Sequence, residues 1–327
     1  MRIRLYSLFL WLILPSVTWA APPRIVSVKK IWDSAGHNAF TDLIRYRDRW
    51  FCTFREAETH VLGDGKLRVL ASDDGEQWKP VALLEEKGID LRDPKLSITP
   101  DGKLMILAGG SVRAATGGYA NRRPRVSFSL NGKDWARLQP ILADGDWLWR
   151  VTWHNGRAWG VSYLGGGGLK TPRAGFLYSS PDGVHYDRVV EMQPAGIAET
   201  TLRFTPAGEM IALARCEYGE RHGQVGVSKP PYKEWEWRSI GQRLGGPNFL
   251  ILHDNTIVAG SRKYGEKPAT VLARMSRADY EPVLTLPSAG DNSYPGLVWH
   301  DNLLWVSYYS SHEGKTSVYL AKVRWSE

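Results

Sequence analysis

The heptapeptide SDDGEQW at residues 72–78 recurs as SLNGKDW at residues 129–135 and as SPDGVHY at residues 180–186. Degenerate copies, SKPPYKEW and SRADY, begin at Ser228 and Ser276. In each complete copy the serine and the aspartate or asparagine are placed to cap backbone N–H groups, and the glycine suits a left-handed turn. The aromatic residue is placed to pack beneath that turn. These units therefore predict hairpins between β-strands.

A second series of turns runs out of phase with the first. Its centres, at steps of 54, 54, 52, 47 and 47 residues, are Asp48, Gly102, Gly156, Gly208, Asn255 and Asn302. Short apolar strands flank each turn, and hairpins with a period of about 50 residues are typical of four-stranded propeller blades. The sequence therefore predicts an all-β fold, a six-bladed β-propeller of four-stranded antiparallel blades. An irregular β-sandwich is the alternative architecture.

The last repeat ends at Val323 without a serine turn of its own. We therefore expect the N-terminal strand Arg24–Trp32 to complete the sixth blade and to close the ring. On this prediction residues 21–327 form a single propeller domain.

The first twenty residues have the features of a secretory signal peptide. Arg2 and Arg4 precede the apolar run 5–14, and Thr18 and Ala20 stand at the two positions that a signal peptidase reads. The run is too short to span a bilayer comfortably, and no cysteine follows it for lipid attachment. We expect a cleaved signal peptide at residues 1–20, a secreted or periplasmic protein, and no stable membrane anchor. A buried N-terminal strand is the alternative.

The composition is that of a globular protein. Hydrophobic residues make up 43% of the chain and charged residues 23%, which excludes a disordered or collagen-like chain. Lys and Arg number 42 against 34 Asp and Glu, but this charge is spread along the chain, so no nucleic-acid partner is expected. The histidines show no HExxH spacing, and we expect no metal and no cofactor. We expect a monomer.

Polar residues fall at equivalent positions of the repeats, on one predicted face of the propeller. The start of each first strand and the end of each second strand lie at the same face, so residues at these two places should meet. Seven residues after the six turns come Arg55, Gly109, Tyr163, Arg215, Arg262 and Tyr309. The first strands are expected to start at Phe40, Asp93, Leu148, Glu199, Pro247 and Tyr294, with Arg92 and Arg150 beside them.

Three arginines at equivalent positions indicate an acidic ligand, because a guanidinium group binds a carboxylate through two parallel hydrogen bonds. The alternative is that the arginines brace the channel through internal ion pairs with Asp93 and Glu199.

The Ser-x-Asp-Gly-x-x-Trp units resemble the Asp-boxes, or BNR repeats, of the sialidase (neuraminidase) superfamily, and the resemblance spans residues 21–327. The stretch 199–215 looks like the family segment that carries a glutamate and the second arginine of a triad. Arg262 occupies the place of the third arginine, and residues 292–295 look like the tyrosine motif. Residues 92–94 resemble the opening of the family's second blade.

The resemblance implies an exo-acting, retaining glycoside hydrolase similar to exo-α-sialidase, with an acidic glycan or glycoconjugate as its substrate. Tyr294 would be the nucleophile and Glu199 would take its proton, since a neutral tyrosine is not repelled by a carboxylate at the anomeric carbon. Arg215 and Arg262 would bind that carboxylate. Further substrate contacts are expected from Arg55, Arg92, Asp93, Arg150, Tyr163 and Tyr309.

Two positions depart from the family pattern. Ala39 stands where the first arginine of the triad belongs. The general acid should lie in the loop after the second strand of blade one, where Asp64 is the first candidate and His60 the second. A propeller lyase or another glycosidase acting on a uronate glycan, with His60 or a tyrosine as base, is an alternative function. A non-catalytic carbohydrate-binding propeller is another.

Overall fold

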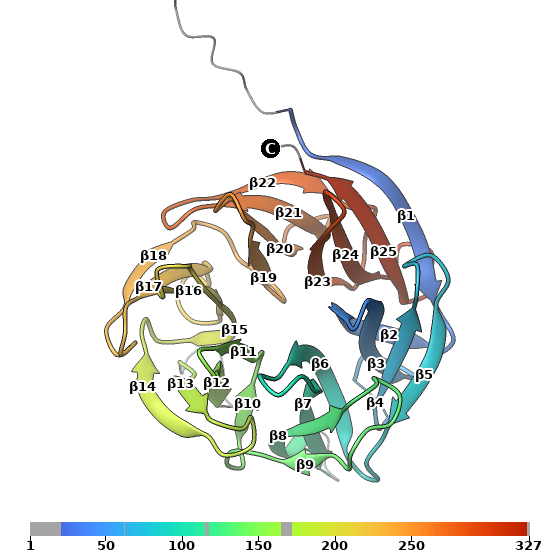
Figure 1. Cartoon of the computed structure of the whole chain (residues 1–327), viewed down its shortest axis with the longest axis horizontal. Coiled ribbons are helices and arrows are strands. Elements are labelled where there is room, and N and C mark those ends of the chain that lie inside the picture. Colours follow the sequence, from blue (N-terminus) through green and yellow to red (C-terminus); the bar gives the residue numbers. More distant parts are fainter. Residues whose placement is uncertain (1–20, 62, 115–117, 165–171, 326–327) are drawn as a thin grey trace, which may run out of the picture.

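The computed structural model describes residues 21–61, 63–114, 118–164 and 172–325 of the chain. The expected signal peptide, residues 1–20, lies outside these described residues. Six antiparallel sheets are arranged as blades around a central axis, which confirms the predicted six-bladed β-propeller (Figure 1). Within the described part of the chain, no helix has the length and apolarity needed to cross a membrane.

The first three blades follow one another along the chain. Blade one consists of β2 (His37–Tyr46), β3 (Arg49–Ala57), β4 (Lys66–Ser72) and β5 (Lys79–Leu84). Blade two consists of β6 (Asp90–Ile98), β7 (Leu104–Arg113), β8 (Tyr119–Ser129) and β9 (Gln139–Pro140). In blade three the first strand is split in two, and the elements are β10 (Asp146–Leu148), β11 (Thr152–His154), β12 (Arg157–Leu164), β13 (Gly175–Ser180) and β14 (Asp187–Met192).

The remaining blades complete the ring. Blade four consists of β15 (Ile197–Phe204), β16 (Met210–Cys216), β17 (Gln224–Ser228) and β18 (Glu236–Ser239). Blade five consists of β19 (Asn248–Ile251), β20 (Ile257–Lys263), β21 (Ala269–Met275) and β22 (Tyr280–Thr285). Blade six consists of β23 (Asn292–His300), β24 (Leu303–Ser310), β25 (Ser317–Arg324) and β1 (Arg24–Trp32).

Strand β1 closes the ring as the sequence predicted. It pairs antiparallel with β25 along its whole length, from Arg24 opposite Arg324 to Trp32 opposite Val318. The first and last strands of the described chain thus share one blade (Figure 1). This arrangement couples the two ends of the chain, because blade six has its outermost strand only when β1 is in place.

Both series of predicted turns are present. All six residues at the centres of the turns between first and second strands have positive φ, from 55° at Asn302 to 79° at Gly208. In the serine turns, the hydroxyl of Ser72 accepts the N–H of Gly75 at 2.8 Å, and Asp74 accepts the N–H groups of Glu76 and Gln77. These backbone donors lower the pKa of Asp74 to about 2. The turns therefore act as hairpin caps.

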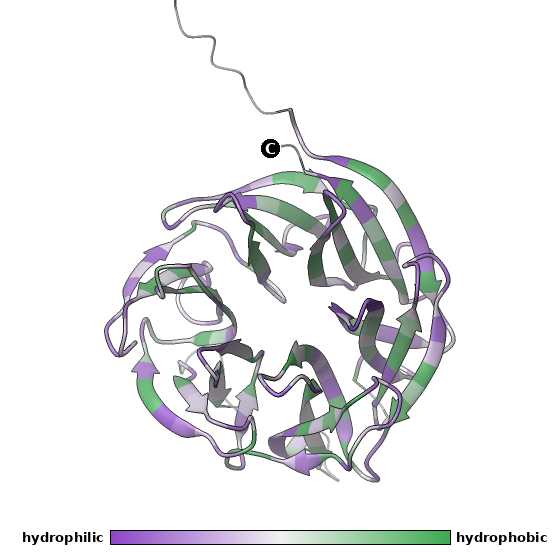
Figure 2. Cartoon of the chain, viewed as in Figure 1, coloured by the Kyte–Doolittle hydropathy of each residue, from purple (hydrophilic) through white to green (hydrophobic). Residues whose placement is uncertain are grey.

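Apolar side chains fill the blades and the spaces between them. Figure 2 shows that the outermost strands, such as β1, alternate between hydrophilic and hydrophobic residues, as expected for strands with one face toward solvent. The second strands are buried along most of their length, as in β7 and β16. Cys52 and Cys216 are buried, free thiols in different blades.

A β-bulge recurs near the start of the first strand in four blades. In β2, β6, β15 and β23 two residues oppose one residue of the neighbouring strand. In three of these bulges a non-glycine residue has positive φ: Phe40 at 64°, Asp93 at 52° and Tyr294 at 54°. Such backbone conformations cost roughly 1–3 kcal/mol each and concentrate at functional sites. The bulges therefore identify the end of the channel where the first strands begin as the candidate functional end.

Candidate active site

The bulged residues and the ends of the second strands meet at one mouth of the central channel. Here Phe40 contacts both Tyr294 and Tyr309, with ring centroids 5.1 and 5.4 Å apart, and Trp149 lies edge-on to Tyr294 at 5.5 Å. Tyr163 belongs to the same buried cluster. These rings come from blades one, three and six, and they form an aromatic floor beneath the polar groups.

Tyr294 and Glu199 form the polar centre of this mouth. The Tyr294 hydroxyl donates to Glu199 Oε1 at 2.6 Å, and Arg215 Nη1 donates to the same oxygen at 3.0 Å. The other oxygen, Oε2, accepts the backbone N–H of Gly246 at 2.7 Å. Gly246 has φ of +61°, and a Cβ there would lie 2.5 Å from the Tyr294 ring. Only glycine therefore allows this N–H to reach Glu199 beneath the tyrosine.

The surroundings of the pair move the two pKa values apart. Burial raises the pKa of Glu199, but Arg215, the Tyr294 hydroxyl and the Gly246 N–H together bring it below its ordinary value. Burial and the negative charge of Glu199 hold the pKa of Tyr294 well above 10. In the resting protein Tyr294 is therefore a neutral phenol that donates a hydrogen bond to an ionised carboxylate.

Arg262 also lies against Tyr294, with its guanidinium carbon 5.7 Å from the centroid of the tyrosine ring. Its Nη2 donates to the Tyr309 hydroxyl at 2.8 Å and to Asp291 Oδ1 at 3.1 Å. Its Nε donates to the Asn292 carbonyl at 2.9 Å. The side chains of Arg215 and Arg262 keep 17% and 16% exposure, so both side chains remain partly accessible to solvent.

A cluster that the sequence did not predict adjoins Arg262. His37 Nε2 lies 3.0 Å and His60 Nδ1 2.6 Å from the same oxygen, Asp291 Oδ2. The two imidazole rings are 5.1 Å apart. His37 is buried, whereas the His60 side chain is 46% exposed. Among the described residues, these three could hold a metal ion, because their ligand atoms all lie within 4.8 Å of one another.

Two of the predicted ligand-binding arginines are internal braces. Arg55 has a side-chain exposure of 0% and donates to the equally buried Asp90 at 2.9 Å. Arg150, at the break between β10 and β11, makes a bidentate pair with the buried Asp42 across the channel, with distances of 2.9–3.0 Å. Burial therefore gives these two arginines ion pairs inside the ring, in place of the ligand contacts expected from the sequence.

Arg92 combines features of the buried, ion-paired arginines and of the arginines at the channel mouth. It donates to Asp90 Oδ2 at 2.7 Å and to the backbone carbonyl of His60. Its guanidinium carbon is 5.9 Å from the Phe40 ring centroid, so it lies at the edge of the mouth. Arg92 fixes the backbone of the loop that carries His60.

Asp93 is brought into the mouth by the bulge of β6. Burial and the negative charge of Glu199 raise the pKa of Asp93, although Lys95 and Arg92 oppose the shift. Within the described residues no hydrogen bond to its carboxyl group is present. Asp93 is therefore a carboxyl group that holds its proton more strongly than an ordinary aspartate, close to the Tyr294–Glu199 pair.

The first candidate for the general acid, Asp64, occupies a different setting. Its carboxylate is exposed and accepts the N–H of Gly88 at 3.1 Å, in the connection between blades one and two. His60, the second candidate, contacts Phe40 with ring centroids 5.4 Å apart and so joins the aromatic floor. The structure places His60 and Asp93 near Tyr294. Asp64 instead contacts the connection between blades one and two through the Gly88 N–H.

Ala39, at the position of the family's first arginine, is completely buried opposite Arg55 in the neighbouring strand. The next residue, Phe40, projects its ring into the mouth instead. Blade one therefore contributes an aromatic side chain and two histidines at the place where the resemblance implies a cation.

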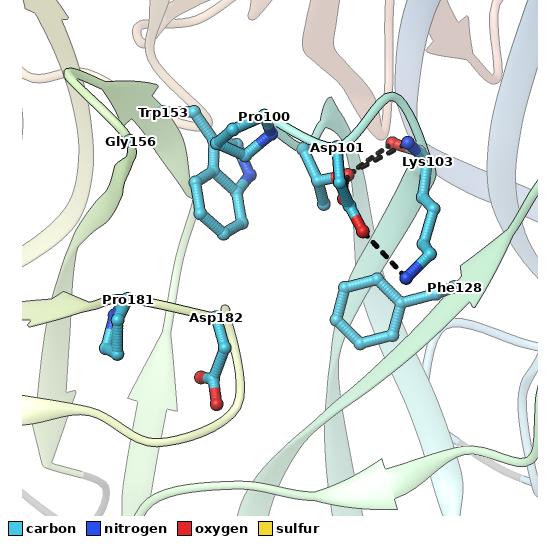
Figure 3. A pocket seen from close by; sticks show the side chains of 9 residues that line it. Pro100, Asp101, Lys103, Phe128, Trp153, Gly156, Pro181 and Asp182 are labelled. Atoms are coloured by element: carbon cyan, nitrogen blue, oxygen red, sulfur yellow. Dashed lines mark hydrogen bonds and ion pairs between the residues drawn. The ribbon is translucent and has the colours of Figure 1, made fainter.

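A separate pocket lies between blades two and three, at the opposite ends of the strands. Its volume is about 310 Å³, and the residues that line it include Asp101, Lys103, Phe128, Trp153 and Asp182 (Figure 3). Asp101 and Lys103 pair with each other at 2.7 Å. This pocket contains none of the residues predicted for the site, and its turns belong to the face away from Tyr294.

Comparison with known proteins supports the fold. No protein-family model and no curated protein matches the chain. A solved protein of unknown function from Dyadobacter fermentans is 19% identical, with a TM-score of 0.81 over 93% of this chain and 99% of that one. The Trypanosoma rangeli sialidase bound to the inhibitor DANA is 13% identical, with a TM-score of 0.67 over 93% of this chain and 60% of that one.

An α-L-arabinofuranosidase of Fusarium graminearum in complex with arabinobiose is 14% identical. Its TM-score is 0.69 over 91% of this chain and 97% of that one. The chain thus spans about three fifths of the trypanosomal sialidase and nearly all of the other two proteins. The solved relatives include glycoside hydrolases of two different specificities, and likenesses at these identities establish the fold alone.

Proposed function

We propose that the protein is a retaining, exo-acting glycoside hydrolase of sialidase type that acts on a terminal acidic sugar. The observation that carries this proposal is the 2.6 Å hydrogen bond from Tyr294 to Glu199, with Arg215 on the same carboxylate oxygen. A tyrosine paired with an ionised carboxylate and flanked by two arginines suits a substrate that bears its own carboxylate beside the reacting carbon.

The first step breaks the glycosidic bond and forms a covalent intermediate. The Tyr294 oxygen attacks the anomeric carbon while its proton passes to Glu199 Oε1, and the bond to the leaving oxygen breaks. A proton from Asp93 converts the leaving oxygen to a hydroxyl group; the raised pKa of Asp93 suits it to this role. In the second step ionised Asp93 takes a proton from water and the water oxygen attacks the anomeric carbon. The bond between that carbon and the Tyr294 oxygen breaks, and Glu199 returns its proton to the Tyr294 oxygen.

Arg215 and Arg262, which both lie against Tyr294, bind the substrate carboxylate. A partly desolvated hydrogen bond between a guanidinium group and a carboxylate is worth roughly 1.5–3 kcal/mol. With Ala39 in the place of a third arginine, this clamp is weaker than one with three guanidinium groups. We therefore propose that the preferred substrate is an acidic sugar other than an ordinary sialic acid conjugate.

A second candidate is a lyase that acts on a uronate glycan. The observation that favours it is His60, whose Nδ1 is held by Asp291 while the ring is half exposed, as suits a general base. The signal peptide proposed for residues 1–20 fits either activity, because it would deliver the protein to extracellular or periplasmic glycans.

One experiment separates these functions. The purified protein is incubated with a panel of sialylated and uronate-bearing glycans, and the products are identified by mass spectrometry. Release of a free, saturated acidic sugar, formed by addition of water across the glycosidic bond, supports the hydrolase. A product with a new carbon–carbon double bond supports the lyase. Binding without any product on the whole panel contradicts both, and identifies the alternative of a carbohydrate-binding propeller.

A further inference from the structure

We propose that His37, His60 and Asp291 form a binding site for a divalent transition-metal ion, with Zn²⁺ as the best match, at the channel mouth beside Arg262. The three residues come from β2, from the loop after β3 and from the residue before β23, so the site joins blade one to blade six. The ring closure described above is what brings these two blades together.

The donor set supports this assignment. Two imidazole nitrogens and one carboxylate oxygen are ligands that Zn²⁺ accepts, and three protein ligands with an open position are typical of zinc sites that bind a further molecule. The two nitrogens lie 3.0 and 2.6 Å from Asp291 Oδ2. Ligands of one ion, each about 2.0–2.2 Å from it, are separated by roughly 3 Å, so only a small adjustment is needed.

The carboxylate ligand is held by a second layer of contacts. The Tyr309 hydroxyl donates to Asp291 Oδ1 at 2.9 Å, and Arg262 donates to the same oxygen at 3.1 Å. These contacts leave Oδ2 directed at the two histidines. Such outer hydrogen bonds orient the ligands of natural metal sites and typically change metal affinity by 10- to 100-fold.

The histidines are held in place as well. The His37 side chain is only 7% exposed and packs beside Tyr309 and Phe40. The backbone of His60 is fixed by Arg92, which donates to its carbonyl. The exposed edge of His60 opens the cluster toward solvent at the mouth, so an ion has a path of entry and a coordination position remains for a ligand.

The position of the cluster indicates a role for the metal ion in substrate binding, and this inference rests on the proposed function. Phe40 touches both His60 and Tyr294, so the cluster lies one aromatic ring away from the nucleophile. Blade one lacks the arginine that the resemblance implies at Ala39. A metal ion at this place supplies positive charge from the same blade, and its open position accepts an oxygen of the substrate carboxylate.

The test of metal binding uses the metal alone. The full protein, freed of metal with a chelator, is titrated with Zn²⁺ and with Co²⁺ by equilibrium dialysis, and Co²⁺ coordination is followed by its visible absorption. We expect one equivalent per chain. His60→Ala should weaken binding at least 100-fold, and Tyr309→Phe should weaken it 10- to 100-fold by freeing the Asp291 carboxylate.

The matched control is His185→Ala, because His185 is an exposed histidine that pairs with Asp182 at 2.7 Å in a serine turn of blade three. This variant should bind the metal as the unmodified protein does. Failure of the unmodified protein to retain one equivalent, or equal retention by His60→Ala, overturns the site. In that case two imidazole rings that share hydrogen bonds to Asp291 account for the cluster.

A second measurement separates the site from its use. The affinity for a free acidic monosaccharide, either a sialic or a uronic acid, is measured with and without Zn²⁺. Tighter binding with the metal supports the carboxylate role, since coupling between two ligands is reciprocal. Unchanged affinity overturns that role but leaves the metal site standing, whatever the outcome of the glycan panel.

Discussion

Replacement of Tyr294 by phenylalanine tests the proposed nucleophile most directly. The change keeps the ring that packs on Phe40 and Trp149 and removes only the oxygen that donates to Glu199 at 2.6 Å. Without that oxygen no covalent intermediate forms. We expect kcat to fall by about 10⁴-fold or more, which corresponds to roughly 5.4 kcal/mol or more of transition-state free energy.

The effect on stability should be much smaller. A hydrogen bond to a charged acceptor is worth about 1.5–3 kcal/mol, but Glu199 keeps Arg215 at 3.0 Å and the Gly246 N–H at 2.7 Å. We therefore expect Tyr294→Phe to lower the free energy of unfolding by about 1–2 kcal/mol, measured by urea denaturation. Affinity for a non-hydrolysed acidic sugar should stay within a few-fold of the original.

Tyr308 offers a matched control. Its hydroxyl donates at 3.0 Å to the carbonyl of Pro287 in the connection between blades five and six, so Tyr308→Phe also removes one buried tyrosine hydroxyl. This variant should lose a similar amount of stability with kcat unchanged. A Tyr294→Phe protein that keeps kcat within tenfold of the original would refute the nucleophile, and with it the sialidase-type mechanism.

Further predictions concern the acid, the clamp, a brace and export. Asp93→Asn should abolish the alkaline limb of the kcat/KM profile, because the original protein needs Asp93 protonated and loses activity as pH rises through its raised pKa. Burial destabilises ionised Asp93, so stability is also lost as pH rises through that pKa, and denaturation curves of Asp93→Asn should lack this loss. Arg262→Lys should weaken acidic-sugar binding by 10- to 100-fold in calorimetry, and unchanged affinity would assign Arg262 to structure alone. Arg150→Met should cost about 3–5 kcal/mol in urea denaturation, because it leaves the buried Asp42 without its ion-pair partner, and adding Asp42→Asn should restore part of this stability. Mass spectrometry of the exported protein should find an N-terminus near Ala21, and an intact Met1 would contradict the signal peptide.

The fold could be predicted from the sequence because its signals are local and repeated. Each turn residue, such as Gly102 or Asn255, has a backbone conformation that its residue type favours. Six copies of the turn, about 50 residues apart, determine the number of blades. The same register also located Arg215, Arg262, Glu199 and Tyr294 at one mouth, since equivalent positions in a propeller lie at equivalent heights.

The partners of these residues could not be predicted in the same way. Whether an arginine faces solvent or a buried carboxylate depends on side chains from other blades, as for Arg150 and Asp42, which lie 108 residues apart. The histidine cluster was missed for the same reason. Its members stand at positions 37, 60 and 291, so no short motif connects them. Asp93 was predicted as a ligand contact, because sequence alone gives no measure of its burial.

The repeated bulge explains why the chemistry gathers at the starts of the first strands. A regular strand would direct successive side chains to opposite faces of the blade. In a β-bulge two residues oppose one residue of the neighbouring strand, and this arrangement directs an extra side chain toward the channel axis. The bulges of blades two, four and six place Asp93, Glu199 and Tyr294 around one point. In blade one the same bulge places Phe40, which contributes packing and no charge. The positive φ of Phe40 costs free energy that its own chemistry does not explain. Its contacts with His60 and Tyr309 supply a reason, because the ring supports the two side chains that orient Asp291 and flank the nucleophile.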